Sequence, residues 1–409
     1  MFPVIEHLDE VLAAVGGREE FMVHRNEALG FVSVLYRYVM SDTFPDPAEN
    51  GIGAGERLRR QLLRECRGIT FDAASGAVIG RKFHKFFGLA EKEETQPHRI
   101  DWSLPHLRLV KADGSLMTPL VLGGRVRWAS KMGVTRVSAP VEAYTDALPA
   151  YQRLAHAAHA MGVTPLFEWC SSEAQRIILD YPEASLVLLA VRGNVTGRYW
   201  HQDEVEALAR EHGVPVIGRA GGTVPDHAAY LRELAGLTGI EGEVIVFESG
   251  ERYKVKTDEY RRMHVALAGL TQEKDVLALV LAEGIDDVKP LVTPDIAGRL
   301  DAFSDAVNRG LDASGAALAD LFLEGHRNFG GDRKRFATEF AKKQPDAALL
   351  FALWDRASDG GDALRIAARD LVAQLVGKNL ASATRVDGVR RLFGGGDVRW
   401  TAEIPDLDA

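Results

Sequence analysis

The chain changes character after residue 257, and this change limits the folds open to it. Residues 31–256 return to short β-rich runs interrupted by Gly, Asp and Ser, with helical stretches between them. Residues 258–377 are instead rich in Ala, Leu, Asp and Arg, with apolar residues at helical spacing. A length of 409 residues is too great for one small domain. We therefore expect an α+β protein, with a β-rich domain at 1–257 and an all-helical domain at 258–409.

The first domain is expected to contain mainly antiparallel sheets. Its β-rich runs are joined by short turn sequences such as Asp-Gly and Gly-Gly, which reverse the chain within a few residues. In the last of these runs polar and apolar residues alternate, which predicts Arg125, Arg127 and Lys131 on one face of a strand. The predicted strands are 67–72, 77–83, 107–111, 116–122 and 125–131.

The second domain offers three predicted helix starts: Thr271, Thr293 followed by Pro294, and Asp332. Each provides a side-chain oxygen that can accept hydrogen bonds from the first free amides of a helix. Near the end of the chain, three consecutive glycines and an acidic terminus predict a loosely held tail.

The composition excludes several classes of protein. With only Cys66 and Cys170 there is no disulfide framework, and a reducing compartment is favoured. The start of the chain lacks a basic region with an apolar core, and no later apolar run is long enough to span a bilayer. The net charge of −9 argues against bulk coating of nucleic acid, although a local basic groove can still bind a polyanion. We expect a cytoplasmic monomer without membrane contact.

Lys111 ends a predicted strand, and the following Asp113-Gly114 provides a turn into the next strand. The ammonium group is therefore expected at the rim of a sheet. At its ordinary pKa of about 10.4 a lysine amine is protonated at neutral pH, yet attack on a phosphate requires the free amine. Burial or neighbouring cations would have to lower that pKa.

Residues 241–256 are typical of a β-hairpin whose second strand carries Lys254 and Lys256 on one face. Two ammonium groups on one face can lower the pKa of a third lysine and hold phosphates. Each feature also has a plainer explanation when taken alone. A lysine before Asp-Gly is usually a solvated residue in a hairpin turn, and Lys254 and Lys256 would form the exposed face of an amphipathic strand.

Six short blocks in the first domain carry a family resemblance: Glu65-Cys66-Arg67-Gly68, Lys85-Phe86-Phe87, Lys111-Ala112-Asp113-Gly114-Ser115, Phe167-Glu168-Trp169, Glu241-Gly242-Glu243-Val244 and Lys254-Val255-Lys256. In order and spacing they resemble the ATP-dependent RNA ligases of the bacteriophage T4 RNA ligase 1 type, over residues 36–256. An accidental match of all six is very improbable. The resemblance implies a nucleotidyltransferase domain of the ATP-grasp-like ligase class, followed by a helical C-terminal domain.

The same resemblance implies a role for each matching residue. Lys111 is similar to the lysine that becomes adenylated, and Lys254 and Lys256 to the pair that contacts and orients the triphosphate. Glu168 and Glu241 resemble the two acidic residues that contact the ribose or position a hydrated Mg²⁺. Mn²⁺ is an alternative metal. Because Mg²⁺ keeps several waters, we expect the two carboxylates to contact the ion through water. The remaining matches are basic residues around the phosphates and ribose (Arg67, Lys85 and Lys131) and residues lining the nucleotide pocket (Tyr36, Phe87 and Val244).

The family chemistry has three steps. Lys111 would attack the α-phosphate of ATP, AMP would pass to a 5′-phosphate on RNA, and a 3′-hydroxyl would displace AMP to seal the strand. DNA ligases and mRNA capping enzymes share the covalent lysine, but they usually carry arginine at the position of Leu116 and continue into an OB barrel. A non-catalytic RNA-binding module would normally lose a lysine or glutamate from the set, and none is missing. These alternatives are therefore less favoured than RNA ligation.

The helical domain suggests a substrate-choosing role, and in the family such a domain accompanies tRNA repair. Basic residues outnumber acidic ones in its segment 326–343, which could grip RNA phosphates, but a solvated helix face explains them equally well. The basic residues are Arg327, Arg333, Lys334, Arg335, Lys342 and Lys343.

Since the sequence contains no P-loop kinase motif, we expect a separate end-healing kinase or phosphatase to prepare the RNA ends. The natural substrate, and whether DNA ends are accepted, stay open.

Overall fold

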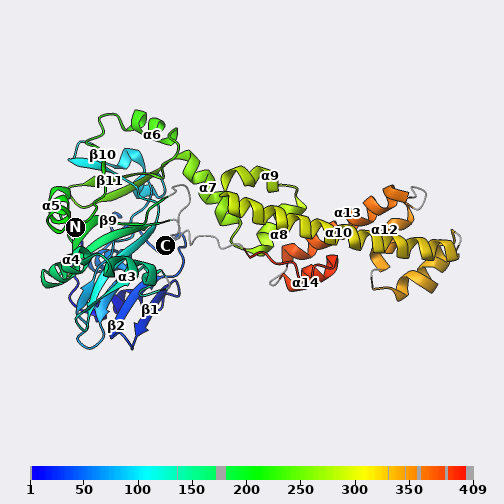
Figure 1. The fold of residues 1–409 in the computed structure, drawn as a ribbon, viewed down its shortest axis with the longest axis horizontal. Coiled ribbons are helices and arrows are strands. Elements are labelled where there is room, and N and C mark those ends of the chain that lie inside the picture. The colour runs from blue at the N-terminus through cyan, green and yellow to red at the C-terminus, as the bar shows by residue number, and fades with distance from the viewer. Residues whose placement is uncertain are drawn as a thin grey trace. The chain divides into compact units, whose positions relative to one another are not determined.

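The computed structural model describes residues 2–135, 137–171, 181–329, 331–345, 347–356, 361–382 and 386–401. The chain divides into two compact units, and the division falls between Arg261 and Arg262. Strands gather in the first unit, and the second is built from helices (Figure 1). The expected α+β class, with antiparallel sheets followed by a helical part, is confirmed.

Three four-stranded sheets form the first unit, in the orders β1-β2-β3-β4, β10-β5-β11-β12 and β7-β6-β8-β9. Adjacent strands in all three sheets are antiparallel. The strands are β1 (Phe21–Asn26), β2 (Phe31–Tyr36), β3 (Arg67–Asp72), β4 (Val78–Gly80), β5 (His106–Val110), β6 (Ser115–Leu122), β7 (Arg125–Ala129), β8 (Val163–Cys170), β9 (Ser185–Gly193), β10 (Arg219–Gly221), β11 (Gly242–Phe247) and β12 (Arg252–Lys256).

The predicted turns explain why neighbouring strands pair. Gly123 and Gly124 have φ values of 55° and 77°, a region that L side chains rarely enter, and they reverse the chain between β6 and β7. The hairpin expected at 241–256 is formed by β11 and β12. The predicted strand at 125–131 is too long, because β7 ends at Ala129.

Among the described residues of the first unit, six α-helices pack on the sheets, and each buries side chains against them. In α4, buried Tyr151, Leu154, Ala155 and Ala158 recur at the three- and four-residue spacing of one helix face. Separate hydrophobic clusters lie under α1 and α2, under α3 to α5, and under α6. The helices are α1 (Leu8–Val15), α2 (Ala54–Glu65), α3 (Ser138–Asp146), α4 (Pro149–Ala160), α5 (Gln202–His212) and α6 (His227–Ala235).

A buried ion cluster joins three segments of the first unit. Arg81 Nε lies 3.0 Å from Glu65 Oε2, and Arg192 Nη2 lies 2.7 Å from Glu65 Oε1, with all three side chains at most 1% exposed. The spare guanidinium hydrogens are satisfied by main-chain carbonyls. Arg81 donates to those of Pro3, Asn194 and Val195, and Arg192 to those of Lys82 and Gly197.

Two helices form the centre of the second unit, α10 (Pro294–Phe329) and α13 (Gly361–Ser382). They approach most closely at Gly315, where a Cβ would lie 2.7 Å from Arg369 Cα. Among the described residues, no helix is both long and apolar enough to cross a membrane. The other α-helices are α7 (Asp258–Gly269), α8 (Glu273–Leu281), α9 (Ile285–Val288), α11 (Arg333–Arg335), α12 (Ala347–Trp354) and α14 (Asp387–Arg390).

Two of the three predicted helix starts are confirmed. The Thr293 hydroxyl accepts from the amide of Ile296 at the start of α10, and the Asp332 carboxylate accepts from two amides of α11. The prediction at Thr271 is wrong, since the N-cap of α8 is Gln272 and the Thr271 hydroxyl donates backward to the Ala268 carbonyl.

The expectation of a loose tail is wrong as far as Trp400. Its indole Nε1 donates to the Leu270 carbonyl at 2.7 Å, and its ring lies against Phe303. Residues 402–409 of the predicted tail lie outside the described residues.

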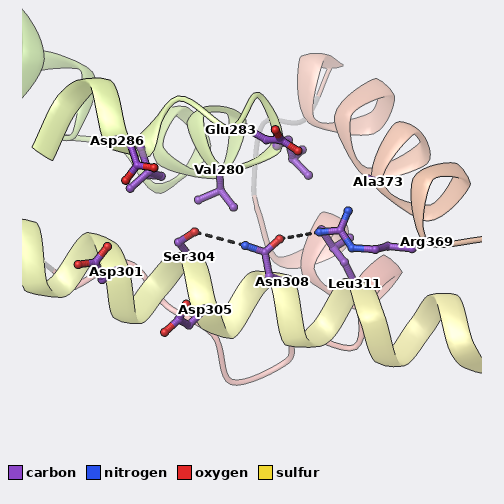
Figure 2. Close-up of a pocket in the computed structure, with 12 residues that line it drawn as sticks. Val280, Glu283, Asp286, Asp301, Ser304, Asp305, Asn308, Leu311, Arg369 and Ala373 are labelled. Atoms are coloured by element: carbon purple, nitrogen blue, oxygen red, sulfur yellow. Dashed lines mark hydrogen bonds between the residues drawn. The ribbon is translucent and has the colours of Figure 1, made fainter. Parts of the chain in front are cut away.

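A pocket of about 400 Å³ opens between α8, α10 and α13 (Figure 2). Along its floor Ser304 and Asn308 are hydrogen-bonded, and Arg369 Nη2 donates to Asn308 Oδ1 at 2.8 Å. Carboxylates of Glu283, Asp286, Asp301 and Asp305 also line it. So many carboxylates disfavour an anion such as phosphate in this pocket.

Glu65→Gln tests the buried ion cluster. Because the neutral side chain would leave two guanidinium groups buried without a counter-charge, we expect the first unit to lose about 3–5 kcal/mol of unfolding free energy. Urea unfolding followed by tryptophan fluorescence measures this. Glu56→Gln on the same helix is the control, because its ion pairs with Arg59 and Arg60 lie on the surface and should change stability by less than about 1 kcal/mol. Equal effects of the two substitutions would contradict the assignment.

The same cluster predicts an acid transition. Burial alone raises the pKa of the Glu65 carboxyl, but the charges of Arg192 and Arg81 outweigh burial and lower it to about 2. A depressed acid contributes stability above its unfolded pKa and loses that contribution as pH falls toward its folded pKa. The stability difference between the wild type and Glu65→Gln should therefore be constant above about pH 4.5 and shrink as the pH approaches 2. Urea titrations at several pH values measure it, and a difference that did not change with pH would refute the prediction.

Candidate active site

Lys111 lies where the chain passes from one sheet to another. It follows β5 directly, its backbone N–H donates to the Gly242 carbonyl at 3.0 Å, and β6 begins four residues later. Gly114 in this connection has no room for a side chain, since a Cβ would lie 2.3 Å from the Trp169 carbonyl oxygen. The backbone around Lys111 is thus fixed by both sheets, as expected for a lysine at a sheet rim.

Glu241 is the direct partner of Lys111. Its Oε1 lies 2.7 Å from Lys111 Nζ and 3.6 Å from Lys256 Nζ. The Glu241 side chain is only 2% exposed, while those of Lys111 and Lys256 are 20% and 29% exposed. One buried carboxylate therefore holds two ammonium groups that can still be reached from outside.

Lys254 and Lys256 lie on one face of β12, as predicted. They pair with Val244 and Gly242 of β11, so Val244 shares that face. The Lys254 ammonium lies 5.1 Å from the centre of the Phe86 ring, and the Phe87 carbonyl accepts from the Lys254 amide. Two segments that are far apart in the sequence are thereby joined at the site.

The protonation of these lysines differs from the sequence-based expectation. Burial lowers the pKa of Lys111, but the charges of Glu241 and Glu168 outweigh burial and raise it above its ordinary value. Lys254 behaves in the opposite way: burial lowers its pKa well below the ordinary value, and the charges of Lys85 and Arg67 lower it further. The cations near Lys111 are present as expected, yet in this structure Glu241 decides its charge.

Glu168 provides the second carboxylate. It lies on β8 opposite Leu116 of β6, one residue from the Trp169 carbonyl that crowds Gly114. Burial raises the pKa of Glu168 to about 7, although the charge of Lys111 opposes this. A half-buried carboxyl of this kind can change protonation near neutral pH.

An aromatic wall surrounds Lys85. Its ammonium lies 5.3 Å from the ring centre of Tyr36 and 5.2 Å from that of Phe87, with Phe44 on the same side at 6.0 Å. Phe44 makes edge contacts with both other rings, and all three rings are at most 4% exposed. The structure thus brings together Tyr36, Lys85 and Phe87, which the sequence had grouped, and adds Phe44.

Arg67 and Lys131 lie beside the Tyr36 ring. The Lys131 ammonium is 4.6 Å from the ring centre, and the positive charges of Arg67, Lys85 and Lys131 outweigh burial in lowering the pKa of Tyr36. Arg67 starts β3 at a bulge, where Gly68 adopts φ +89° and a Cβ would lie 2.5 Å from the Lys131 carbonyl oxygen. The bulge brings the two cations to one place.

Lys131 is not on the same strand face as Arg125 and Arg127, so this part of the prediction is wrong. It lies in a turn beyond the end of β7 and is 5% exposed, whereas Arg127 pairs with Glu142 on α3. Alternation along a strand cannot be continued past a turn.

Two tyrosines of the site were missed by sequence reasoning. The Tyr181 hydroxyl accepts from the backbone N–H of Asp113 at 3.1 Å and so braces the segment after Lys111. Tyr260 places its ring 4.6 Å from the Lys256 ammonium, and its hydroxyl is hydrogen-bonded to Glu241. Tyr260 follows Lys256 by only four residues, which was a usable signal, and Tyr181 lies near a motif but was given no role.

Carboxylates of the site could hold a divalent metal ion. Within the described ranges, no three His, Cys, Asp or Glu side chains gather closely enough to hold an ion. Glu241 already contacts two lysines, and the charges of Glu168 and Asp113 also act on Lys111. Mg²⁺ is commonly bound through one or two carboxylates while keeping several waters.

Sequence comparisons with known proteins point to RNA ligases. A family model described as RNA ligase matches residues 65–260. A candidate RNA ligase of Thermovibrio ammonificans is 31% identical over 295 residues, which are 70% of this chain and 72% of that protein. RNA ligase 1 of bacteriophage TS2126 is 32% identical over 262 residues, 61% of this chain and 60% of that protein. Among solved structures, an archaeal ATP-dependent RNA ligase matches 63% of this chain and 64% of its own at 16% identity, with a TM-score of 0.43.

The matched segment contains every candidate site residue except Tyr36. It also contains Glu241 and the two lysines that this carboxylate contacts, Lys111 and Lys256. The chain belongs to the RNA ligase family of the T4 RNA ligase 1 type, which is a family of enzymes.

Proposed function

We propose that this protein is an ATP-dependent RNA ligase that joins a 3′-hydroxyl to a 5′-phosphate through AMP bound covalently to Lys111. The observation that carries the proposal is that the ammonium groups of Lys111 and Lys256 both lie within 3.6 Å of one carboxylate oxygen, Glu241 Oε1. A reachable lysine amine beside a second cation is the arrangement that nucleotidyl transfer requires. Family membership gives the reaction class.

In the first step, the Lys111 Nζ lone pair attacks the α-phosphorus of ATP, and the bond to pyrophosphate breaks. The amine must first lose a proton, and Glu241 opposes that loss while it is paired with Lys111. When a ribose hydroxyl or a hydrated ion engages Glu241, its hold on the Lys111 proton weakens while Lys254 and Lys256 stay in place. Mg²⁺ held through water by Glu168 and Glu241 would supply positive charge against the phosphates.

The cations surrounding the site have complementary tasks. Lys254 and Lys256 contact and orient the triphosphate, while Arg67, Lys85 and Lys131 offset charge on the phosphates and ribose hydroxyls. Tyr36, Phe87 and Val244 line the nucleotide pocket. In the second step AMP passes to the RNA 5′-phosphate and Lys111 regains a proton. In the third, the 3′-hydroxyl attacks the RNA-bound phosphate and AMP leaves.

A DNA ligase or capping enzyme is the second candidate, and one structural observation weighs against it. Leu116, where those enzymes usually carry arginine, is 5% exposed and packs in a cluster with Phe83, Leu166 and Ala190. A guanidinium group there would be buried among apolar side chains. A binding module without catalysis is disfavoured because the full set of lysines and glutamates is present.

Lys111→Ala tests the covalent mechanism. With labelled ATP and Mg²⁺ the wild type should form one protein–AMP adduct, and the variant none, because no other group replaces the nucleophile. The variant should still seal RNA that already carries 5′-linked AMP, since the last step uses no lysine nucleophile, and this serves as its folding control. An adduct that survives in Lys111→Ala would refute the mechanism. Sealing of nicked DNA alone, with 5′-phosphorylated RNA offered in parallel, would favour the DNA ligase.

We infer a role in tRNA binding for the second unit, as a separate proposal. Its segment 326–343 exposes Arg333 and Arg335 by 57% and 59%, but these pair with Asp355 and Glu339. Lys334, Lys342 and Lys343 add positive charge. The acidic pocket of Figure 2 is unsuited to phosphates, so this basic segment is the better candidate for an RNA grip. As part of the same proposal, a separate kinase or phosphatase heals the RNA ends before this protein joins them.

Replacing Arg333, Lys334 and Arg335 together by alanine tests the tRNA grip. We expect unchanged adenylylation of Lys111, roughly tenfold weaker tRNA binding at low salt and a flatter salt dependence, because phosphate contacts release counterions. Gel-shift titrations at several salt concentrations measure this. The matched control removes three exposed arginines of the first unit, Arg153, Arg210 and Arg232. Equal weakening in both triple variants would mean that only total charge matters.

A further inference from the structure

Residues 37–42 form an exposed loop between two buried aromatic residues of the site. Tyr36 before the loop and Phe44 after it are 4% and 2% exposed, whereas Tyr38, Val39 and Met40 are 44%, 44% and 56% exposed. Three consecutive large apolar side chains in water are costly unless they bind something.

The loop lies at the rim of the aromatic wall around Lys85. Its two flanking rings, Tyr36 and Phe44, lie 5.3 and 6.0 Å from the same Lys85 ammonium. Since an extended chain covers at most about 3.6 Å per residue, Tyr38 and Met40 cannot lie far from this ammonium.

The backbone of the loop is held in place at several points. The Arg37 amide donates to the Glu20 carbonyl and the Met40 amide to the Thr43 hydroxyl, each at 2.8 Å. Lys92 Nζ donates to the Ser41 carbonyl at 3.1 Å. A loop that is already ordered offers its apolar side chains at a low entropic cost of binding.

The charge around the loop is positive, although the chain as a whole has a net charge of −9. Lys85 and Lys92 flank the Phe87 ring, Arg67 and Lys131 adjoin Tyr36, and Arg37 belongs to the loop itself. Asp42 is the loop's one acidic residue, and the nearby Arg18 and Glu20 are paired with each other. Aromatic and apolar side chains beside a group of cations fit a single-stranded nucleic acid, whose bases stack while its phosphates are neutralised.

We propose that Tyr38, Val39 and Met40 bind the first nucleotides of the 5′-phosphorylated RNA strand, with a base stacked on Tyr38. This rests on the proposed function. Attacking and leaving groups lie roughly in line at phosphorus, so pyrophosphate leaves opposite Lys111 Nζ and the RNA 5′-phosphate must later arrive from that same side. In that second step the new P–O bond forms as the P–N bond to Lys111 breaks. In this proposal, the nucleotides behind the attacking phosphate pass over the loop.

The test uses the full chain in single-turnover transfer. Protein carrying preformed lysyl-AMP is freed of ATP and mixed with increasing concentrations of a short 5′-phosphorylated RNA. Tyr38→Ala should raise the half-saturating RNA concentration roughly 5- to 100-fold, and Tyr38→Phe, which keeps the stacking ring, should stay within about twofold of the wild type. Met40→Ser should weaken RNA use in the same direction. Met161→Ser is the matched control, since Met161 is 49% exposed on the first unit away from this loop.

Formation of lysyl-AMP from ATP, measured without RNA, separates the outcomes. It should be unchanged in all four variants. If Tyr38→Ala uses RNA as the wild type does, the inference is overturned, and a protein partner becomes the better occupant of the loop. Equal losses in Tyr38→Ala and Tyr38→Phe, or a loss of lysyl-AMP formation itself, would overturn it as well. Should the wild type form no adduct, the proposed function has failed, and fluorescence anisotropy of the same RNA with the same variants still decides whether the loop binds RNA.

Discussion

Glu65 lies between the guanidinium groups of Arg81 and Arg192, where all three side chains are at most 1% exposed. Burying three charges is costly, and it is tolerated here because both arginines also donate to main-chain carbonyls. The cluster ties the end of α2 to β9 and to the segment after β4. Arg67 follows Glu65 by two residues and Lys85 follows Arg81 by four, so the cations of the site are positioned by this buried anchor.

Glu241 plays the corresponding part for Lys111. It precedes β11, whose first residue Gly242 accepts the Lys111 amide, so the carboxylate and the amine are held by the same pair of strands. The carboxylate keeps Lys111 protonated while Lys254 is held at a pKa well below its ordinary value. The same site therefore raises the pKa of one lysine and lowers that of another.

The two units differ in the kind of evidence they provide. In the first unit, chemistry-bearing residues from six sequence blocks meet, and several are buried or half-buried although they are charged, which is a cost that function explains. In the second unit, basic residues are exposed and partly paired with Asp355 and Glu339, and the pocket is acidic. The first arrangement supports catalysis directly, while the second leaves RNA binding to be tested by experiment.

The sequence by itself determined the α+β class, the antiparallel hairpins and most of the helical part, because turn residues and apolar periodicity are local signals. It also identified Lys111, Glu241 and Lys256, through blocks shared with a family. Only the tertiary structure decided that Glu241 raises the pKa of Lys111, that Lys131 lies in a turn beyond β7, and that Tyr181 braces the segment after Lys111. These facts depend on distances between groups far apart in the chain, and electrostatic and hydrogen-bonding energies follow such distances rather than sequence order.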